Sequence, residues 1–211
     1  MIIYDGSSLA NLYIRQQAEK AHDAQLITGP ELSSIKENYP TGFYTPNLVI
    51  RIGFFILTLI GSLFTGLLLS FIFSETHFVD HPVWLLFLGL ITYVALEFLV
   101  KQMHFFKAGI DDALLWQTAA LITVSFIWAM GDQNKEYLFL AGFVLLLSLY
   151  FTLRFANNLM SVVAFLSFLA LIFFSWGKAG TIGEATMPFI MMLFSWLIFF
   201  TAGRAAKDTR T

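Results

Sequence analysis

The feature that most constrains this chain is a series of long, uncharged apolar segments. The first begins at about Asn47 and continues to Phe73 with no charged residue after Arg51. Roughly 20 apolar residues suffice to cross about 30 Å of hydrocarbon as an α-helix. Hydrophobic residues make up 58% of the 211 residues and charged residues only 12%, which excludes a soluble globular protein. The sequence therefore predicts an all-α integral membrane protein.

Six such segments follow one another along the chain. They cover about residues 47–73, 82–100, 111–130, 136–153, 158–176 and 185–203. The connections between them are short, so neighbouring helices are expected to be antiparallel. We predict a six-transmembrane-helix bundle over residues 46–204, followed by a short tail over residues 205–211.

The N-terminal segment, residues 1–45, is polar and has no long apolar run. A first helix is expected to begin at Ser7 or Ser8, either of which can cap it. A second helix is marked by Thr28-Gly29-Pro30-Glu31, which matches a capping box with proline in the first turn. Tyr39-Pro40 ends this helix, because the residue before a proline disfavours helical backbone. The segment therefore predicts a short helical hairpin joined to the membrane domain by a linker.

The distribution of lysine and arginine predicts the orientation in the membrane. Ten of the 12 fall on one side of the predicted spans: Arg15, Lys20, Lys36, Arg51, Lys101, Lys107, Arg154, Arg204, Lys207 and Arg210. Only Lys135 and Lys178 fall on the other side. By the positive-inside rule, the hairpin and both termini are predicted to be cytoplasmic.

Composition also limits the partners and cofactors of the chain. The formal net charge is −2, which gives no basic excess for nucleic-acid phosphates, so nucleic acid is not an expected partner. The apolar segments make the lipid bilayer the expected partner. The chain has no cysteine, which excludes disulfides, cysteine-ligated zinc and iron–sulfur clusters. No cofactor or metal site is predicted, since no helical pair of histidines with a glutamate has metal-ligand spacing. Known catalytic motifs are also absent, which disfavours an enzyme.

The densest polar cluster of the membrane part lies between residues 97 and 112. On a helix, Glu97, Lys101 and His104 share one face. Glu97 lies about one turn inside the predicted membrane boundary, where an ionised group needs a partner or water. The favoured interpretation is a Glu97–Lys101 ion pair, and the alternative is a site that handles protons or cations.

Two aspartates open the third predicted span. Asp111 and Asp112 are placed to cap its N-terminus, where the helix dipole favours carboxylates. Asp111, Thr118 and Ser125 recur every seven residues and form a polar stripe on one helical face. If this stripe met the face formed by Tyr93 and Glu97 of the second span, the two would make a hydrogen-bonded seam, either structural or the wall of a cavity. We favour the structural role.

Arg154 marks the predicted cytoplasmic turn between the fourth and fifth spans. Its guanidinium can pair with Glu97, Asp111 or Asp112, or it can extend toward lipid phosphates. Arg51 has the same two interpretations. The candidate ion or proton site predicted from the sequence consists of Glu97, Lys101, His104, Asp111, Asp112 and Arg154.

The N-terminal third resembles a known family. Ala24-Gln25-Leu26-Ile27-Thr28-Gly29-Pro30-Glu31-Leu32, followed by a first span that runs from Arg51-Ile52-Gly53 to Gly61, is similar to a bacterial family of predicted membrane proteins of unknown function. The resemblance covers about residues 10–70. It implies a short helical segment followed by hydrophobic spans in a bacterial inner membrane, and it carries over no functional residue.

These observations favour a structural, regulatory or accessory membrane protein whose cytoplasmic hairpin binds a membrane or cytoplasmic protein. The alternative is a small transporter or channel subunit that moves protons or cations through the acidic cluster. Such a subunit would need an oligomer or a hidden repeat, because little polarity lies at mid-membrane depth. A third hypothesis is an enzyme that acts on lipid head groups at the same rim.

Overall fold

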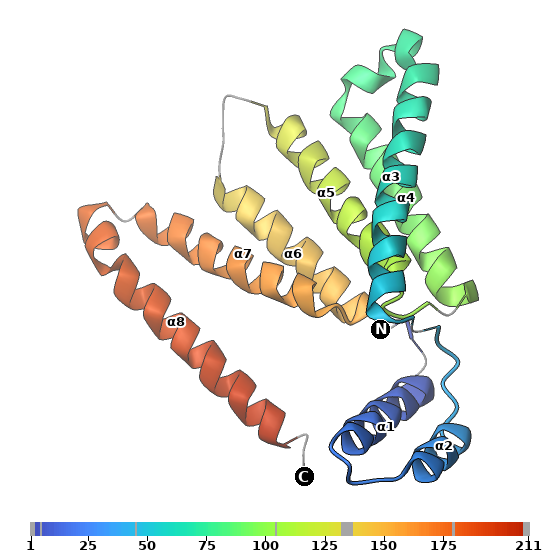
Figure 1. The fold of residues 1–211 in the computed structure, drawn as a ribbon. Helices are drawn as coiled ribbons and strands as arrows, with labels where there is room; N and C mark the ends of the chain where they lie inside the picture. The colour runs from blue at the N-terminus through green and yellow to red at the C-terminus, as the bar shows by residue number, and fades with distance from the viewer. Residues whose placement is uncertain are drawn as a thin grey trace. The chain divides into compact units, whose positions relative to one another are not determined.

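The computed structural model describes residues 3–4, 6–44, 46–103, 105–131, 137–178 and 180–208. Within these ranges the regular structure is helical, which confirms the all-α prediction (Figure 1). The α-helices are α1 (Gly6–Asp23), α2 (Gly29–Asn38), α3 (Leu48–Ile72), α4 (Pro82–Met103), α5 (Ile110–Met130), α6 (Tyr137–Phe155), α7 (Asn158–Gly177) and α8 (Thr181–Asp208). Two short 3-10 helices, η1 (Ser74–Thr76) and η2 (Phe78–Asp80), join α3 to α4.

Five of the described helices, α3 to α7, are long and apolar enough to cross a membrane. Each agrees with one of the first five predicted spans to within a few residues. The sixth predicted span falls inside α8, a 28-residue helix that contains Pro188 and the apolar segment Ala185–Phe200. This architecture is that of a multi-pass membrane protein.

The chain divides into two compact units. The first comprises Met1–Ala129 with Leu153–Ala156, and the second comprises Met130–Thr152 with Asn157–Thr211. The last turn of α6 therefore belongs to the first unit, together with α1 to α5.

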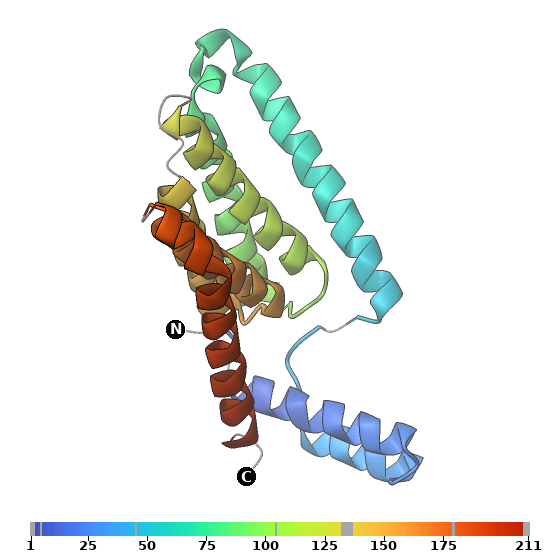
Figure 2. The same cartoon turned by 90° about the vertical axis from the view of Figure 1, so that its left-hand side faces the viewer.

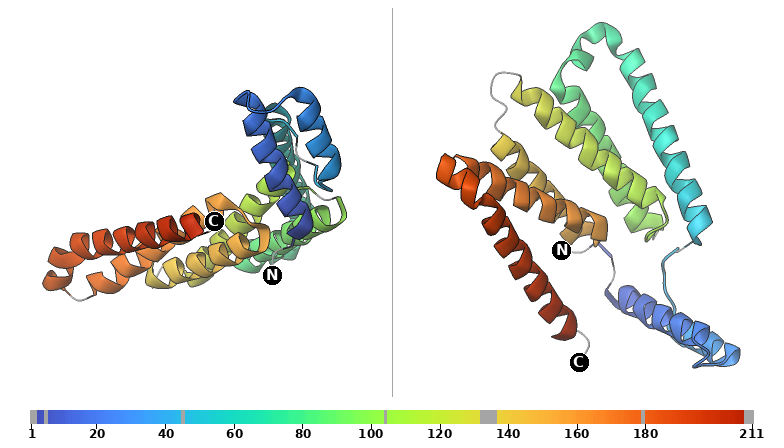
Figure 3. Two further views of the ribbon diagram at one scale, coloured as in Figure 1. Left: turned by 90° about the horizontal axis from the view of Figure 1, so that it is seen from below. Right: turned by 60° about the vertical axis from the view of Figure 1, so that its left-hand side comes forward.

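Helices α1 and α2 lie side by side in the first unit (Figure 3). The Asn11 side-chain amide donates to the carbonyl oxygen of Pro40 over 2.9 Å. Lys36 Nζ lies 2.8 Å from Glu19 Oε1, and the Arg15 guanidinium donates to the carbonyl oxygen of Lys36. These polar contacts, rather than a large apolar core, hold the two helices together.

The start of α2 has the predicted capping box. The Glu31 carboxylate accepts the backbone N–H of Thr28 over 2.7 Å and the Thr28 hydroxyl over 2.8 Å. These two hydrogen bonds favour the ionised carboxylate and lower the pKa of Glu31. The Thr28 side chain faces the backbone N–H of Glu31, which completes the capping box.

Helices α4 and α5 are joined by the polar stripe that the sequence predicts. Thr118, which is fully buried, donates to the Thr92 hydroxyl over 3.0 Å, and Ser125 donates to the carbonyl oxygen of Pro82 over 2.7 Å. The stripe therefore meets α4 as a seam, but on the side of Thr92 and Pro82. The face of α4 that carries Tyr93 and Glu97 contacts Arg154 instead, so the stripe does not meet that face, and the seam conditional on such a contact is formed elsewhere on α4.

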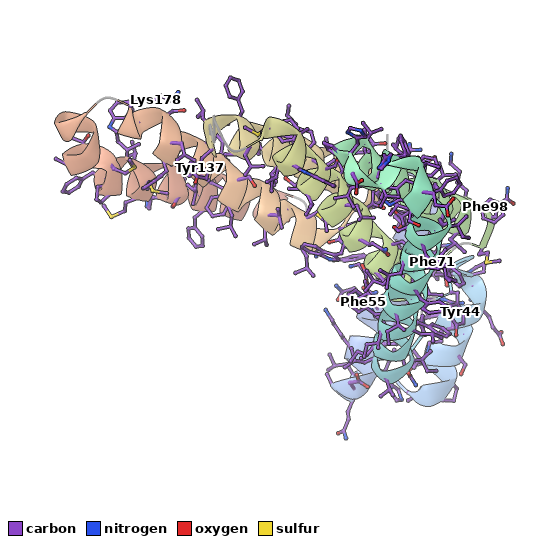
Figure 4. All side chains as sticks on the ribbon, turned by 90° about the horizontal axis from the view of Figure 1, so that it is seen from above. Tyr44, Phe55, Phe71, Phe98, Tyr137 and Lys178 are labelled. Atoms are coloured by element: carbon purple, nitrogen blue, oxygen red, sulfur yellow. The ribbon has the colours of Figure 1, made fainter. Side chains whose placement is uncertain are left out.

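Helix α3 joins α4 at one end and diverges from it toward its own N-terminus (Figure 2). The joined end is built around Trp84, which is buried against the rings of Phe73, Phe78 and Phe87. The Trp84 indole N–H donates to Ser70 Oγ over 2.9 Å. Much of the rest of α3 is exposed, and the Phe71 side chain, labelled in Figure 4, is 80% accessible. This outer face of α3 suits contact with lipid.

The second unit is held largely by contacts among apolar side chains of α6, α7 and α8. The rings of Phe168 on α7 and Phe194 on α8 lie edge to face at 5.9 Å. One polar contact joins the same two helices, since the Trp176 indole N–H donates to the Thr186 hydroxyl over 2.9 Å. Helices α7 and α8 are thus a connected antiparallel pair, as short connections predict.

Candidate functional site

Glu97 is the centre of a cluster of charged side chains near the end of α4. Its carboxylate accepts the Tyr93 hydroxyl over 2.8 Å and Lys101 Nζ over 3.2 Å. Tyr93 and Lys101 lie one turn before and one turn after Glu97, so the three share one face of the helix. The predicted Glu97–Lys101 pair is therefore present in the structure.

Arg154 completes this cluster from the last turn of α6. Its Nε and Nη2 both donate to Glu97 Oε1, over 3.1 and 2.6 Å. Both side chains are partly buried, with 23% of Glu97 and 27% of Arg154 accessible. Arg154 donates two charge-assisted hydrogen bonds and is less exposed than Lys101, which donates one, so Arg154 is the principal partner of Glu97. Of the three carboxylates predicted as partners of Arg154, the one it contacts is that of Glu97.

The last turn of α6 also contacts the N-terminal segment of the chain. The backbone N–H of Ile3 donates to the carbonyl oxygen of Arg154 over 3.0 Å. The ring of Phe155 lies edge to face against Tyr93 at 6.3 Å. Glu97 and its partners therefore join α4, the last turn of α6 and the N-terminal segment at one place.

Asp111 forms a second cluster in the loop before α5. Its carboxylate accepts the backbone N–H groups of Lys107, Ala108 and Gly109 over 2.7, 2.9 and 3.0 Å. The Asp111 side chain is buried, and the residue is 5% accessible. These donors belong to the loop that precedes α5, so Asp111 fixes that loop to the first turn of the helix, and the hydrogen bonds are not those of an N-cap to the helix N–H groups.

Asp112 pairs with Arg51 from the first turn of α3, and Arg51 Nη2 lies 2.5 Å from Asp112 Oδ2. The backbone of Gly109 lies so close to α3 that a Cβ there would be 2.1 Å from the carbonyl oxygen of Arg51. Gly109 also has a φ of +97°, which L side chains rarely adopt. The loop before α5 is thus fitted closely against the start of α3.

An aromatic cluster, which the sequence did not reveal, lies beside these aspartates. Tyr4 is buried, and its ring meets those of Phe43 and Phe106 edge to face at 5.8 and 4.9 Å. Burial raises the pKa of the Tyr4 phenol, and the nearby Asp111 and Asp112 raise it further. The signal available in the sequence is the pair of adjacent aromatic residues at 43–44 and at 105–106, each outside an apolar span.

Five of the six predicted site residues thus fall into two clusters. Glu97, Lys101 and Arg154 form one, while Asp111 and Asp112 belong to the other. The prediction for His104 lies outside the described residues. Within the part of the chain that the structure describes, no group of three or more histidine, aspartate or glutamate side chains is arranged to hold a metal ion.

The chemistry of these clusters follows from how many hydrogen bonds each carboxylate accepts. An ionised carboxylate has about four lone-pair positions. Glu97 accepts four hydrogen bonds from three side chains, and Asp111 accepts three from the backbone. The arrangement therefore suits the fixing of helix ends. No protein-family model, no curated protein and no solved structure matches this chain.

Proposed function

We propose that this chain is a multi-pass protein of the bacterial inner membrane with a structural, regulatory or accessory role. In this proposal α1 and α2 form a cytoplasmic hairpin that binds a membrane or cytoplasmic protein. The observation that carries the proposal is that the carboxylates of the candidate site are bound by groups of the chain itself. The bacterial inner membrane is part of the proposal and is what the resemblance predicted for residues 10–70 implies.

Transport through the acidic cluster has less support. A carboxylate in an ion path must exchange its ligands as the ion passes. A cation that reached Glu97 would have to displace Arg154 or Lys101, both of which are positively charged and hydrogen-bonded to it. The same contacts weigh against a catalytic carboxylate acting on lipid head groups at this rim. A fixed structural junction needs no such exchange.

Six spans with both termini in the cytoplasm are part of the proposal. Arg51, Lys101 and Arg154, which the positive-inside rule assigns to the cytoplasm, take part in the two clusters of the first unit. Helix α8 supplies the sixth crossing, since it contains the apolar segment Ala185–Phe200 and continues beyond it at both ends.

Single cysteines test this topology directly, because the chain has none of its own. We expect Glu75→Cys, between α3 and α4, to react with a membrane-impermeant maleimide in intact spheroplasts. Ser34→Cys in α2 and Thr211→Cys at the end of the chain should react only after the membrane is permeabilised. Labelling at position 211 from the outside would contradict six spans, and labelling at position 34 would contradict a cytoplasmic hairpin.

Photo-cross-linking tests whether the hairpin binds a partner. Tyr13 on α1 is 62% accessible, whereas its neighbour Leu12 is buried at 8%. We expect a benzophenone side chain at position 13, in membranes of the native cell, to give a discrete adduct of higher mass. The same group at position 12 is the matched control and should give none. If illumination consumes the benzophenone at position 13 and no adduct of higher mass forms, the partner-binding role is contradicted.

A further inference from the structure

A partly open cavity of about 350 Å³ lies in the first unit between α3, α4 and α5. Most of its wall is apolar, and the lining includes Leu63, Leu67, Leu88, Ile91, Leu114 and Leu121. Small-molecule sites in proteins typically have volumes of about 300–1,000 Å³, and an apolar cavity of about 150 Å³ can hold benzene. The size therefore suits a ligand of about two fused rings or an equivalent length of hydrocarbon.

One polar side chain of this cavity lacks a hydrogen-bond partner. Gln117 lines the cavity from α5, is 9% accessible, and its buried Oε1 accepts no hydrogen bond. It lies about 10 Å along α5 from the start of the helix, well inside the predicted membrane span. A buried amide oxygen without a donor is costly, and in hydrocarbon no bulk water can supply one.

The hydroxyl groups of the cavity wall do not supply that donor. Four of them donate to carbonyl oxygens of their own helices: Ser62 to Thr58 at 2.6 Å, Thr65 to Gly61 at 2.8 Å, Ser70 to Gly66 at 2.9 Å and Thr92 to Gly89 at 2.9 Å. Each hydroxyl has a single hydrogen to donate, so these groups can now only accept. None of these four hydroxyls therefore donates to Gln117 Oε1, which leaves the acceptor capacity of the amide oxygen unused.

We propose that this cavity binds a hydrocarbon-rich alcohol or phenol whose hydroxyl donates to Gln117 Oε1. The apolar wall accommodates the hydrocarbon body, and rotation about the last side-chain torsion, which is broad for amides, turns the oxygen toward the cavity. A lipid acyl chain offers no donor. A single water molecule needs two to four polar partners, which a wall of mainly leucine side chains provides poorly.

A matched pair of probes tests the site in the full chain, purified in lipid nanodiscs. The probe 2-naphthol has the donor, whereas 2-methoxynaphthalene has nearly the same shape without it. We expect equilibrium dialysis, corrected for partition into empty nanodiscs, to show that 2-naphthol binds about tenfold more tightly, the effect of one hydrogen bond to a buried group. Equal affinity for the two probes would overturn the proposal.

Three variants locate the effect. Gln117→Leu should abolish the preference for 2-naphthol, while Gln102→Leu, the same change at an exposed position of α4, should keep it. Gly66→Leu should reduce the binding of both probes, because Gly66 lines the cavity and its Cβ would meet only Leu88, at 3.8 Å. This last variant leaves Gln117 unchanged, so it tests the site even if Gln117→Leu fails to fold. A preference that persists in Gln117→Leu, or undiminished binding to Gly66→Leu, would refute the assignment.

Discussion

Replacing Gly109 with alanine should lower the free energy of unfolding by at least about 3 kcal/mol, a sum of backbone strain and overpacking. The new Cβ would lie 2.1 Å from the carbonyl oxygen of Arg51, so α3 or the loop before α5 must move. The φ of +97° adds strain that glycine does not have. Moving the loop would also disturb the pairing of Arg51 with Asp112. Unfolding of the purified protein in mixed micelles, followed by circular dichroism, measures the loss.

Gly131→Ala is the matched control for this prediction. Gly131 also has a positive φ, +64°, but a Cβ there would have no atom within 4 Å. Only the strain of a positive φ at a residue with a Cβ remains, and the unfolding free energy is expected to fall by about 1 kcal/mol. If Gly109→Ala cost no more than Gly131→Ala, the close contact between the loop and α3 would not contribute to stability.

The second large effect is expected at the junction of Glu97 with Arg154. Removing either charge leaves the other partly buried without its main partner, so Glu97→Gln and Arg154→Gln should each cost about 2–3 kcal/mol of unfolding free energy. The double variant should cost less than the sum of the two, by about 1–2 kcal/mol, since the pair is lost only once. The same unfolding measurement provides all three values.

Lys101→Gln is the control for this cycle. Lys101 contacts the same carboxylate, but its side chain is 53% accessible. An exposed ion pair of this kind contributes about 0–1 kcal/mol. Strictly additive effects of Glu97→Gln and Arg154→Gln would show that the two side chains are not coupled. An equal cost for Lys101→Gln would show that Arg154 is not the principal partner of Glu97.

The sequence predicts the features that depend on local pattern. Uncharged apolar runs mark α3 to α7, because the length of a helix that crosses a membrane is fixed by the bilayer. The spacing of Glu97 and Lys101 predicts their pairing, since residues four apart on a helix are neighbours. The position of Asp111 at the start of α5 predicts a role at that helix end, although its hydrogen-bond donors are loop amides rather than N–H groups of the helix.

The features that depend on distant segments were not predictable. Arg154 had several acidic partners available, and only the position of the last turn of α6 beside α4, within the first unit, selects Glu97. The contact of Gly109 with Arg51 joins residues from two helices, and no periodicity marks it. Gln117 lies beside the predicted stripe of Thr118 rather than on it, so its position in a cavity depends on where α3 lies.

The most direct test of the proposed role is an ion-flux measurement on the purified chain in proteoliposomes. Internal pH is followed while proton, sodium and potassium gradients are imposed, with Glu97→Gln measured beside the unchanged protein. If Glu97 is a fixed structural group, neither protein should carry flux above that of protein-free liposomes. A flux in the unchanged protein that Glu97→Gln abolishes would contradict the accessory role and identify Glu97 as part of an ion path.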